Sequence, residues 1–407
     1  MQFSPGDRVA LSLPGSVAYV ETVIGLLAAE VVPVPLDPLL TEDERVDILA
    51  DLSPALLVTE SAQLEQLRAG FPVGLPRARP MHVTSGTTGR PKGVWSGILP
   101  ADLSAALVQE ERDLWGLESC DVHLVLSPIH HSAPLRFSMG TLLAGGRVLF
   151  PGPFDPAAVT AAIERERPTT MFCVPTHLQR LFAHWDAHGW PDLSSFRLVA
   201  HAGAPCPEPI KRRLIEAFPA GSTWEFYGST EGQFTACPSQ EWLARPGTLG
   251  RARPGRQLRV DDDGVLWCRV PEHARFSYFS DPEKTAAAWD GDWFTVGDLG
   301  RIDEDGYVFL DGRREDLIIS GGVNVYPAEV ENVLSHVAGV EQIAVFGRQD
   351  PDWGMRVCAA YVGTASPDAL REYARQHLAP AKRPKDYVQL DALPMTATGK
   401  VRRLDLR

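Results

Sequence analysis

Short apolar runs of the kind that form β-strands alternate with stretches of helical periodicity through the first half of this chain. Apolar side chains recur at helical spacing over residues 17–27, between strand-like runs at 8–13 and 31–36. The same alternation returns between residues 123 and 218. A parallel pair of strands needs a long crossover, usually a helix, so this alternation favours layered α/β structure with largely parallel sheets. We therefore expect an α/β fold made of layered subdomains.

The pattern changes after this region. Residues 266–310 consist of short β segments separated by Gly and Asp turns, which predicts a small β-rich part. The remaining residues mix strands with helices expected near 327–336 and 367–378, which is typical of a small α+β domain. A charged, turn-rich stretch separates the two regions. We place the domains at residues 1–312 and 313–407.

Charge and cysteine usage exclude several classes of protein. The net charge of −13 disfavours nucleic acid or an anionic membrane as a partner. The six cysteines lie far apart with no C-x-x-C pair, so a zinc site or a disulfide framework is not expected and a reducing compartment fits. The first residues show no signal-peptide pattern, and no run approaches the ~18 apolar residues of a membrane span. We expect a cytoplasmic protein without a membrane span.

The stretch Thr84-Ser85-Gly86-Thr87-Thr88-Gly89-Arg90-Pro91-Lys92-Gly93 is rich in hydroxyls, glycines and cations. Glycines allow the backbone to approach an oxyanion, and clustered N–H groups form an anion-binding nest. Hydroxyls and cations complete a site suited to polyphosphate. The spacing is not that of a Walker A loop. Taken alone, the segment would be explained equally well as a flexible Gly/Thr hairpin.

Four further clusters follow in the sequence. The stretch Glu225-Phe226-Tyr227-Gly228-Ser229-Thr230-Glu231-Gly232 offers an aromatic ring for a purine, and a hydroxyl beside a carboxylate for Mg²⁺. Asp298 ends a β segment and could accept both ribose hydroxyls. Arg313 lies at the domain boundary, and Lys400 follows Gly399 near the C-terminus. Each has a plain structural alternative: a core aromatic, a turn former, a surface ion pair and a solvated tail residue.

In their order along the chain, these five motifs resemble the adenylate-forming superfamily, which includes acyl-CoA synthetases, adenylation domains of peptide synthetases and firefly luciferase. The resemblance extends from about residue 6 to residue 406. It implies ATP, Mg²⁺ and coenzyme A as cofactors, bound by a large N-terminal domain and a small mobile C-terminal domain. The N-terminal domain would hold the ATP site and the acyl pocket.

The resemblance also assigns roles to residues. The ATP phosphates would be bound by Thr84, Ser85, Gly86, Thr87, Thr88, Gly89 and Lys92. The adenosine would be bound by Gly203, Ala204, Pro205, Glu225, Phe226, Tyr227, Gly228, Asp298 and Arg313, with Tyr227 stacked on the adenine. Thr230 and Glu231 would serve the phosphates and Mg²⁺. Lys400 would be the adenylation lysine, Glu315 the hinge, and Gly322 part of the path by which the thiol approaches.

One further segment indicates which branch of the adenylate-forming superfamily the chain resembles. Ser127-Pro128-Ile129-His130-His131-Ser132-Ala133-Pro134 resembles a motif of acyl-CoA synthetases, in which His131 would be the catalytic histidine and His130 the gate of the acyl pocket. The alternative is that one of these histidines is an ordinary core residue. Amino-acid-activating relatives usually place an aspartate in the acyl pocket, and residues 130–137 contain no acidic residue. An acyl or aryl acid is the expected substrate.

Three functions remain open. The leading hypothesis is a carboxylic acid–CoA ligase that acts on a small-molecule acid through an acyl-adenylate and releases AMP and pyrophosphate. The second is an adenylating enzyme that passes the acyl group to a carrier-protein thiol or to an amine. The third is an inactive nucleotide-binding scaffold, which the presence of Lys92, Glu231, Asp298, Arg313 and Lys400 disfavours.

The chain also departs from the family pattern. Only 25 positions (84 minus 59) separate the strand-like run that ends at Thr59 from Thr84, and the Gly6-Asp7 pair comes earlier than in relatives. We expect this shortening to expose an apolar face that a second copy could cover in a homodimer. It also leaves the shape of the acyl tunnel and the CoA site open.

Overall fold

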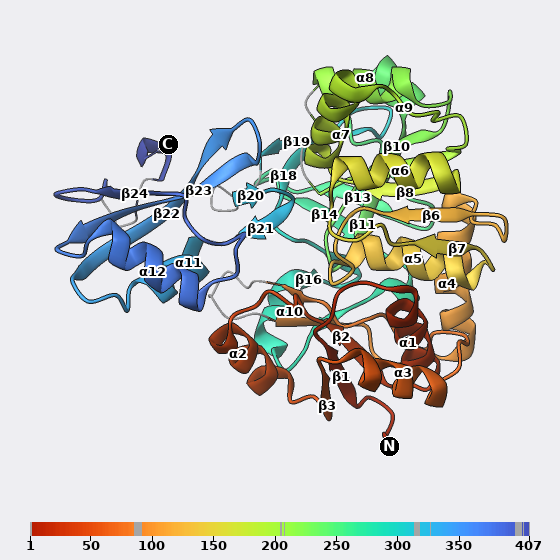
Figure 1. Ribbon diagram of the computed structural model, residues 1–407, viewed down its shortest axis with the longest axis horizontal. Coiled ribbons are helices and arrows are strands. Elements are labelled where there is room, and N and C mark those ends of the chain that lie inside the picture. Colours follow the sequence, from red (N-terminus) through yellow and green to blue (C-terminus); the bar gives the residue numbers. More distant parts are fainter. Residues whose placement is uncertain are drawn as a thin grey trace. The chain divides into compact units, whose positions relative to one another are not determined.

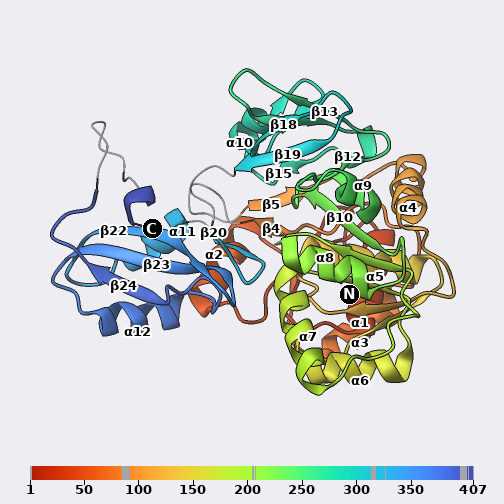
Figure 2. The same cartoon turned by 90° about the horizontal axis from the view of Figure 1, so that it is seen from above.

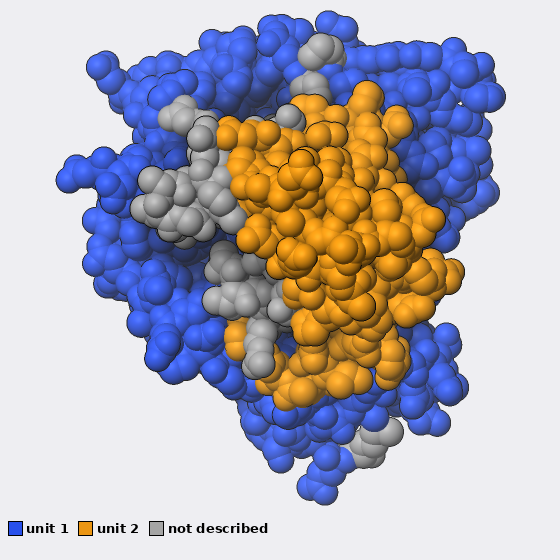
Figure 3. Space-filling view, turned by 90° about the vertical axis from the view of Figure 1, so that its left-hand side faces the viewer, with its two compact units in different colours: residues 1–38, 52–83, 93–312 blue, residues 39–51, 84–92, 313–407 orange. Residues whose placement is uncertain are grey.

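Two compact units make up the chain in the computed structural model (Figures 1 and 3). The structure describes residues 2–84, 92–203, 206, 208–312, 318–325, 327–394, 401 and 403–406. Unit 1 comprises residues 1–38, 52–83 and 93–312, and unit 2 comprises residues 39–51, 84–92 and 313–407. The roles predicted for residues 1–312 and 313–407, nucleotide and acyl binding and the delivery of a lysine, stay predictions.

Unit 1 begins with a small parallel sheet. Its central strand β1 (Arg8–Leu11) pairs with β2 (Val32–Pro35) and β3 (Leu56–Val58). Helix α1 (Val17–Ala28) crosses between the first two strands, and the Ser16 side chain caps it by accepting from the Tyr19 N–H at 3.1 Å. Helix α3 (Ser61–Gly70) packs against α1.

A seven-stranded sheet forms the centre of unit 1. Its strands lie in the order β12-β11-β10-β9-β8-β6-β7, and the pairs between β10 and β7 are all parallel. The strands are β6 (Val122–Val125), β7 (Arg147–Leu149), β8 (Thr170–Cys173), β9 (Leu198–His201), β10 (Thr223–Gly228), β11 (Gln233–Pro238) and β12 (Arg251–Ala252). At one edge of the sheet, β11 pairs antiparallel with β10, and β12 pairs antiparallel with β11.

Alternating side chains of β6 cover both faces of this sheet. Leu124 packs into a core with α6 (Pro156–Glu166), α7 (Pro175–His188) and α8 (Glu208–Ala217). Val125 points to the opposite face, where α5 (Ser132–Leu143) and α1 share one core. Helices α1 and α5 therefore lie between the two parallel sheets, and α6 to α8 cover the outer face (Figures 1 and 2). The predicted α/β layering is confirmed.

Short strands follow, as the Gly and Asp turns predict. One sheet has the order β13-β14-β17-β16, another β15-β5-β4, and β18 pairs with β19. The bounds are β4 (Val83–Thr84), β5 (Lys92–Trp95), β13 (Gln257–Val260), β14 (Leu266–Arg269), β15 (Ser277–Tyr278), β16 (Trp289–Asp290), β17 (Trp293–Phe294), β18 (Leu299–Ile302) and β19 (Val308–Gly312). Helices α4 (Ala101–Trp115), α9 (Ser239–Ala244) and α10 (Pro282–Ala288) and a 3-10 turn, Glu272–Ala274, complete unit 1.

Unit 2 contains a mixed sheet and its own core. Strands lie in the order β21-β20-β23-β22, and β24 pairs with β23. They are β20 (Ile318–Ser320), β21 (Val323–Val325), β22 (Val340–Asp350), β23 (Gly354–Gly363) and β24 (Asp386–Gln389). Helices α11 (Pro327–Leu334) and α12 (Pro367–His377) pack on the sheet, and the expected α+β character is confirmed. Helix α2 (Glu42–Leu52) and the 3-10 turn Arg403–Leu406 are the other helical segments described. None of the described helices is long and apolar enough to cross a membrane.

The core of unit 1 contains a neutral histidine that should make folding sensitive to acid. His123 is 1% exposed, and burial lowers its pKa from 6.5 to about 3, although Asp121 opposes this effect. Since the unfolded chain takes up the proton first, stability is fully present above about pH 6.5 and declines as the pH falls towards 3.

We expect His123→Gln to reduce this acid sensitivity. Urea unfolding at pH 7 and pH 5 should show a smaller loss for the variant, by up to about 1.4 kcal/mol per pH unit. His188, which is exposed on α7, provides the matched control His188→Gln. Equal losses in the wild type and both variants would show that His123 does not stay neutral in the fold.

Candidate active site

Two of the predicted nucleotide residues lie in direct contact. Tyr227, on β10, donates a hydrogen bond from its hydroxyl to Oδ2 of Asp298 at 2.5 Å. The two residues are 6% and 8% exposed, and the tyrosine ring packs on Phe234 with centroids 4.8 Å apart. The Thr295 hydroxyl shapes the turn before Asp298 by accepting from the Gly297 N–H at 2.9 Å. An aromatic ring and a carboxylate 71 positions apart are thereby fixed side by side.

The two residues before Tyr227 on β10, Glu225 and Phe226, point to opposite faces of the sheet and are held on both faces. The Glu225 carboxylate accepts from the buried Lys211 ammonium at 3.2 Å, and this lysine also contacts His201. Phe226 packs in a cluster of aromatic rings with Trp115. These contacts fix β10 on both of its faces, and the strand ends at Gly228, immediately before the turn.

Thr230 and Glu231 lie in the tight turn between β10 and β11. The Ser229 N–H donates to the carbonyl of Gly232 at 2.8 Å, and a Cβ at Gly232 would meet the Phe294 ring at 2.6 Å, so only glycine fits there. Glu231 is 8% exposed, and its Oε1 accepts from the Tyr278 hydroxyl at 2.9 Å. The turn presents one hydroxyl and one oriented carboxylate.

The Thr230 hydroxyl and the Glu231 carboxylate are oxygen ligands of the kind that Mg²⁺ takes. Mg²⁺ takes hard oxygen ligands and usually keeps waters and substrate phosphates, so one or two protein oxygens suffice. Within the described part of the chain there is no group of three His, Cys, Asp or Glu side chains that could hold a metal. Thr230 and Glu231 therefore suit a metal that arrives with a polyphosphate, rather than a metal enclosed by protein ligands alone.

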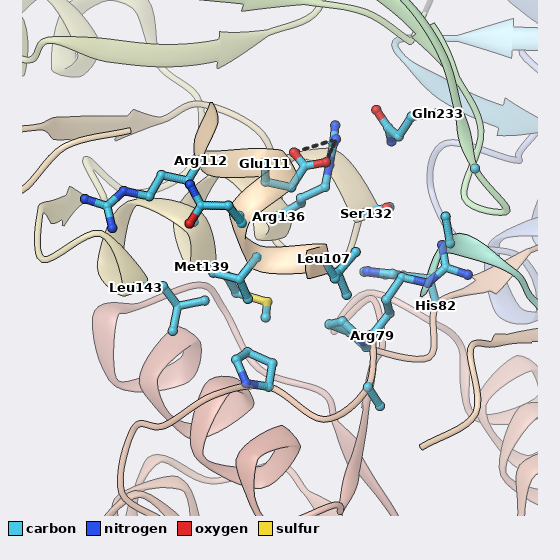
Figure 4. A pocket seen from close by; sticks show the side chains of 18 of the residues that line it. Arg79, His82, Leu107, Glu111, Arg112, Ser132, Arg136, Met139, Leu143 and Gln233 are labelled. Carbon is cyan, nitrogen blue, oxygen red and sulfur yellow. Dashed lines mark hydrogen bonds and ion pairs between the residues drawn. The ribbon is translucent and has the colours of Figure 1, made fainter. Parts of the chain in front are cut away.

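A cavity of about 170 Å³ adjoins this turn (Figure 4). The residues that line it come from the loop before β4, from α4 and α5, and from the β10–β11 turn. Its apolar wall includes Leu107, Val108, Met139 and Leu143, while Thr230 and Gly232 line it at the turn. A cavity of ~150 Å³ can hold one benzene ring. The cavity therefore suits a small acyl or aryl group.

Three histidines lie near the cavity and are uncharged. Burial lowers the pKa of His82 to about 4, that of His130 to about 2 and that of His131 to about 4. His131 immediately precedes α5, and its ring lies 4.2 Å from that of His130. The Nδ1–H of His82 donates to the carbonyl of His130 at 2.9 Å, so Nε2 is its basic nitrogen. At neutral pH these rings add no positive charge to the site.

The cavity also holds charged residues that the sequence motifs did not indicate. Glu111 lines it, although residues 130–137 contain no acid. Burial opposes ionisation of Glu111, but Arg136 and Arg253 outweigh that effect and lower its pKa to about 2. The carboxylate is thus paired with two guanidinium groups at 2.7 to 3.1 Å. It offers little attraction for a substrate ammonium.

Two parts of the chain match known protein families. Residues 1–77 and 81–271 match the AMP-binding enzyme family, and residues 329–400 match the AMP-binding enzyme C-terminal domain. Feruloyl-CoA synthase of Amycolatopsis sp. is 35% identical over 454 aligned residues, covering 99% of this chain and 89% of the relative. The chain belongs to the AMP-binding enzyme family.

This AMP-binding enzyme falls in the CoA ligase branch of the adenylate-forming superfamily, as its motifs predicted. 2-Succinylbenzoate–CoA ligase of Listeria monocytogenes is 31% identical, covering 82% of this chain and 70% of the relative. The o-succinylbenzoate CoA synthetase of Bacillus subtilis superposes with a TM-score of 0.86 at 26% identity, covering 99% and 88% of the two chains. An amide bond synthetase of Marinactinospora thermotolerans gives 0.86 at 28% identity, covering 100% and 90%.

The other predicted site residues of this AMP-binding enzyme lie at separate positions in the structure. Thr84 ends β4 and donates to the Lys92 carbonyl at 3.4 Å, while the Lys92 ammonium lies 3.7 Å from Asp51. Gly203 follows β9 and Gly322 lies in the β20–β21 turn, with φ of +87° and +81°. The predicted residues outside the described part of the chain are Ser85, Gly86, Thr87, Thr88, Gly89, Ala204, Pro205, Arg313, Glu315 and Lys400. Their roles stay predictions.

Proposed function

We propose that this protein is an ATP-dependent carboxylic acid–CoA ligase that works through an acyl-adenylate and releases AMP and pyrophosphate. The observation that carries the proposal is the cavity beside Thr230 and Gly232, which would place a small acid at the turn suited to the ATP phosphates. The relatives named as CoA ligases support CoA as the acceptor.

The first half-reaction would join two anions. The acid's carboxylate attacks the α-phosphate of ATP, and pyrophosphate leaves with the electrons of the broken P–O bond. Negative charge grows in the transition state, so stabilisation must come from groups already in place. Thr230 and Glu231 would hold Mg²⁺, which when bound shields the phosphate oxygens. Tyr278 keeps the Glu231 carboxylate in position through its 2.9 Å hydrogen bond.

Adenosine would be held by the Tyr227–Asp298 pair, with Asp298 accepting from the ribose hydroxyls. In the second half-reaction, the CoA sulfur attacks the acyl carbon and AMP departs. The walls of the cavity are mostly apolar, which favours exclusion of water from a mixed anhydride that hydrolyses readily. His82 and His131 are neutral and offer hydrogen bonds without a charge that would hold the acid in its ground state.

A second candidate is transfer of the acyl group to an amine. The similarity to an amide bond synthetase over 100% of this chain favours it. The two candidates share the first half-reaction and differ only in the acceptor. A preformed acyl-adenylate should therefore be offered to CoA, to simple amines and to a carrier-protein thiol in parallel. We expect CoA to discharge it fastest, and preferential discharge by an amine would support the second candidate.

The acid should need no α-amine. Glu111, the acidic residue among the described residues that line the cavity, is already paired with Arg136 and Arg253, so an ammonium would lose hydration without gaining a free partner. We expect aliphatic and aryl acids to trigger ATP-dependent pyrophosphate release, with thioester formed only when CoA is present. Release by free amino acids alone would contradict this substrate class.

A further inference from the structure

Positive charge exceeds negative charge in the wall of the acyl cavity. We define the arginine cluster as Arg79, Arg136, Arg253 and Arg256, which come from the loop before β4, from α5 and from the loop between β12 and β13. Among the described residues, two carboxylates, Glu110 and Glu111, form ion pairs with its members. The Arg79 guanidinium instead donates to the backbone carbonyls of Glu231 and Arg275.

The pairing of the cluster is also incomplete. Arg136 uses Nη1 for both oxygens of Glu111, and its Nε and Nη2 atoms are buried without a hydrogen-bond partner among the described residues. Nε and Nη2 lie along the same edge of the planar guanidinium, which is the edge that binds a carboxylate in bidentate fashion. Arg256, which is 8% exposed and lines the same cavity, also leaves Nε unpaired within the described structure.

Buried donors without acceptors destabilise a fold unless something else satisfies them. Arg136 is held in position by Glu111 and by the Phe226 ring, whose centroid lies 5.2 Å from Cζ. Its side chain lines the cavity and remains 18% exposed (Figure 4). The figure shows the Glu111–Arg136 pair on α4 and α5, and Arg79 and His82 on the loop before β4.

We propose that the substrate is a dicarboxylic acid, whose second carboxylate binds Arg136 while the first is adenylated beside Thr230. This inference rests on the proposed function and names the substrate class of the same site. Arg136 and Arg256 both contribute positive charge to the wall of the cavity. Nε and Nη2 of Arg136 are buried, so this edge binds a carboxylate after the guanidinium turns towards the cavity. The apolar side chains of Leu107 and Met139 would contact the short or aromatic spacer between the two acid groups.

The test compares each diacid with its half-amide, in which a neutral amide of nearly the same size replaces one carboxylate. Suitable pairs are terephthalate with 4-carbamoylbenzoate, and glutarate with its monoamide. The kcat/KM of pyrophosphate release should be at least tenfold higher for the better diacid than for its half-amide, about 1.4 kcal/mol. A half-amide that is used as well as its diacid in every pair would overturn the proposal.

Substitution of Arg136 separates binding of the second carboxylate from a structural role. Arg136→Gln should reduce the diacid preference to less than threefold, mainly through a higher KM for the diacid. Arg136→Lys, which keeps the charge but loses the fork, should give an intermediate preference. Arg165→Gln removes an arginine that is 69% exposed on α6 and should leave the preference unchanged.

Other results would contradict the binding of the second carboxylate by Arg136. Equal loss on both acids in Arg136→Gln would make Arg136 structural and overturn the assignment. Loss of preference in Arg112→Gln instead would place the second carboxylate at the exposed side of α4, which also contradicts it. If the glutamine variant does not fold, the lysine variant and the wild-type acid pairs decide the question. If no acid releases pyrophosphate, the proposed function itself fails, and that result is distinct from equal use of diacid and half-amide.

Discussion

Replacing Lys400 by alanine should lower the rate of thioester formation from acid, ATP and CoA by at least ~100-fold, the order expected for the loss of one electrostatic stabiliser. The proposed role of this lysine is to neutralise charge that grows when the carboxylate attacks the α-phosphate. That charge is largest in the transition state, so the loss should appear in kcat rather than only in KM. Steady-state measurement of pyrophosphate release gives both values. Lys385, an exposed lysine near β24, supplies the matched control Lys385→Ala, which should retain normal activity.

The rate of the second half-reaction should change little in the Lys400→Ala variant. Given preformed acyl-adenylate and CoA, Lys400→Ala should form thioester within roughly tenfold of the wild-type rate, which corresponds to about 1.4 kcal/mol. This follows if the small domain delivers Lys400 only for adenylation and then turns about Glu315, because hinge positions absorb such a change. An equal loss in both assays would refute the alternation and make Lys400 a general binding or structural residue.

Glu231→Gln should abolish most Mg²⁺-dependent exchange of pyrophosphate into ATP and leave thermal stability nearly unchanged. A neutral amide is a much poorer ligand for a hard cation than a carboxylate. The amide oxygen can still accept the hydrogen bond that the Tyr278 hydroxyl now donates to Oε1, so the turn should keep its packing. Exchange measured over a Mg²⁺ titration, together with a thermal melt, tests both parts of this expectation.

Tyr278→Phe provides the reciprocal control for Glu231. It removes the donor but keeps the carboxylate, so it should retain most exchange activity and lose about 1 kcal/mol of stability, the value of a typical hydrogen bond. Unfolding of Glu231→Gln, or a greater loss of exchange in the Tyr278 variant, would show that the carboxylate is primarily structural.

The sequence predicted the layers of unit 1 because each layer depends on local pattern. Alternating runs such as 8–13 and 17–27 form β1 and α1 in the structure, where Ser16 caps the helix. The order of strands in the seven-stranded sheet was not predictable in the same way. It depends on which crossovers place β6 between β7 and β8, and single-strand patterns do not encode this order.

The sequence indicated candidate site residues where they belong to a recognisable short motif. Thr230 and Glu231 could be found because they adjoin Tyr227 in one short segment. The arginine cluster joins Arg79, Arg136 and Arg256 from three distant segments, so no spacing rule connects them. Their only signal in the sequence was arginine at positions that the fold buries, and burial is known only once the layers are packed.

The most direct test of the proposed chemistry follows oxygen atoms. The acid that gives the highest rate of pyrophosphate release is prepared with ¹⁸O in its carboxylates and incubated with enzyme, ATP and CoA. Attack of a carboxylate oxygen on the α-phosphate, followed by attack of the thiol on the acyl carbon, must leave one labelled oxygen in AMP. Mass spectrometry should therefore find ¹⁸O in AMP and none in pyrophosphate. Unlabelled AMP, or ADP together with labelled phosphate, would contradict an acyl-adenylate pathway for this protein.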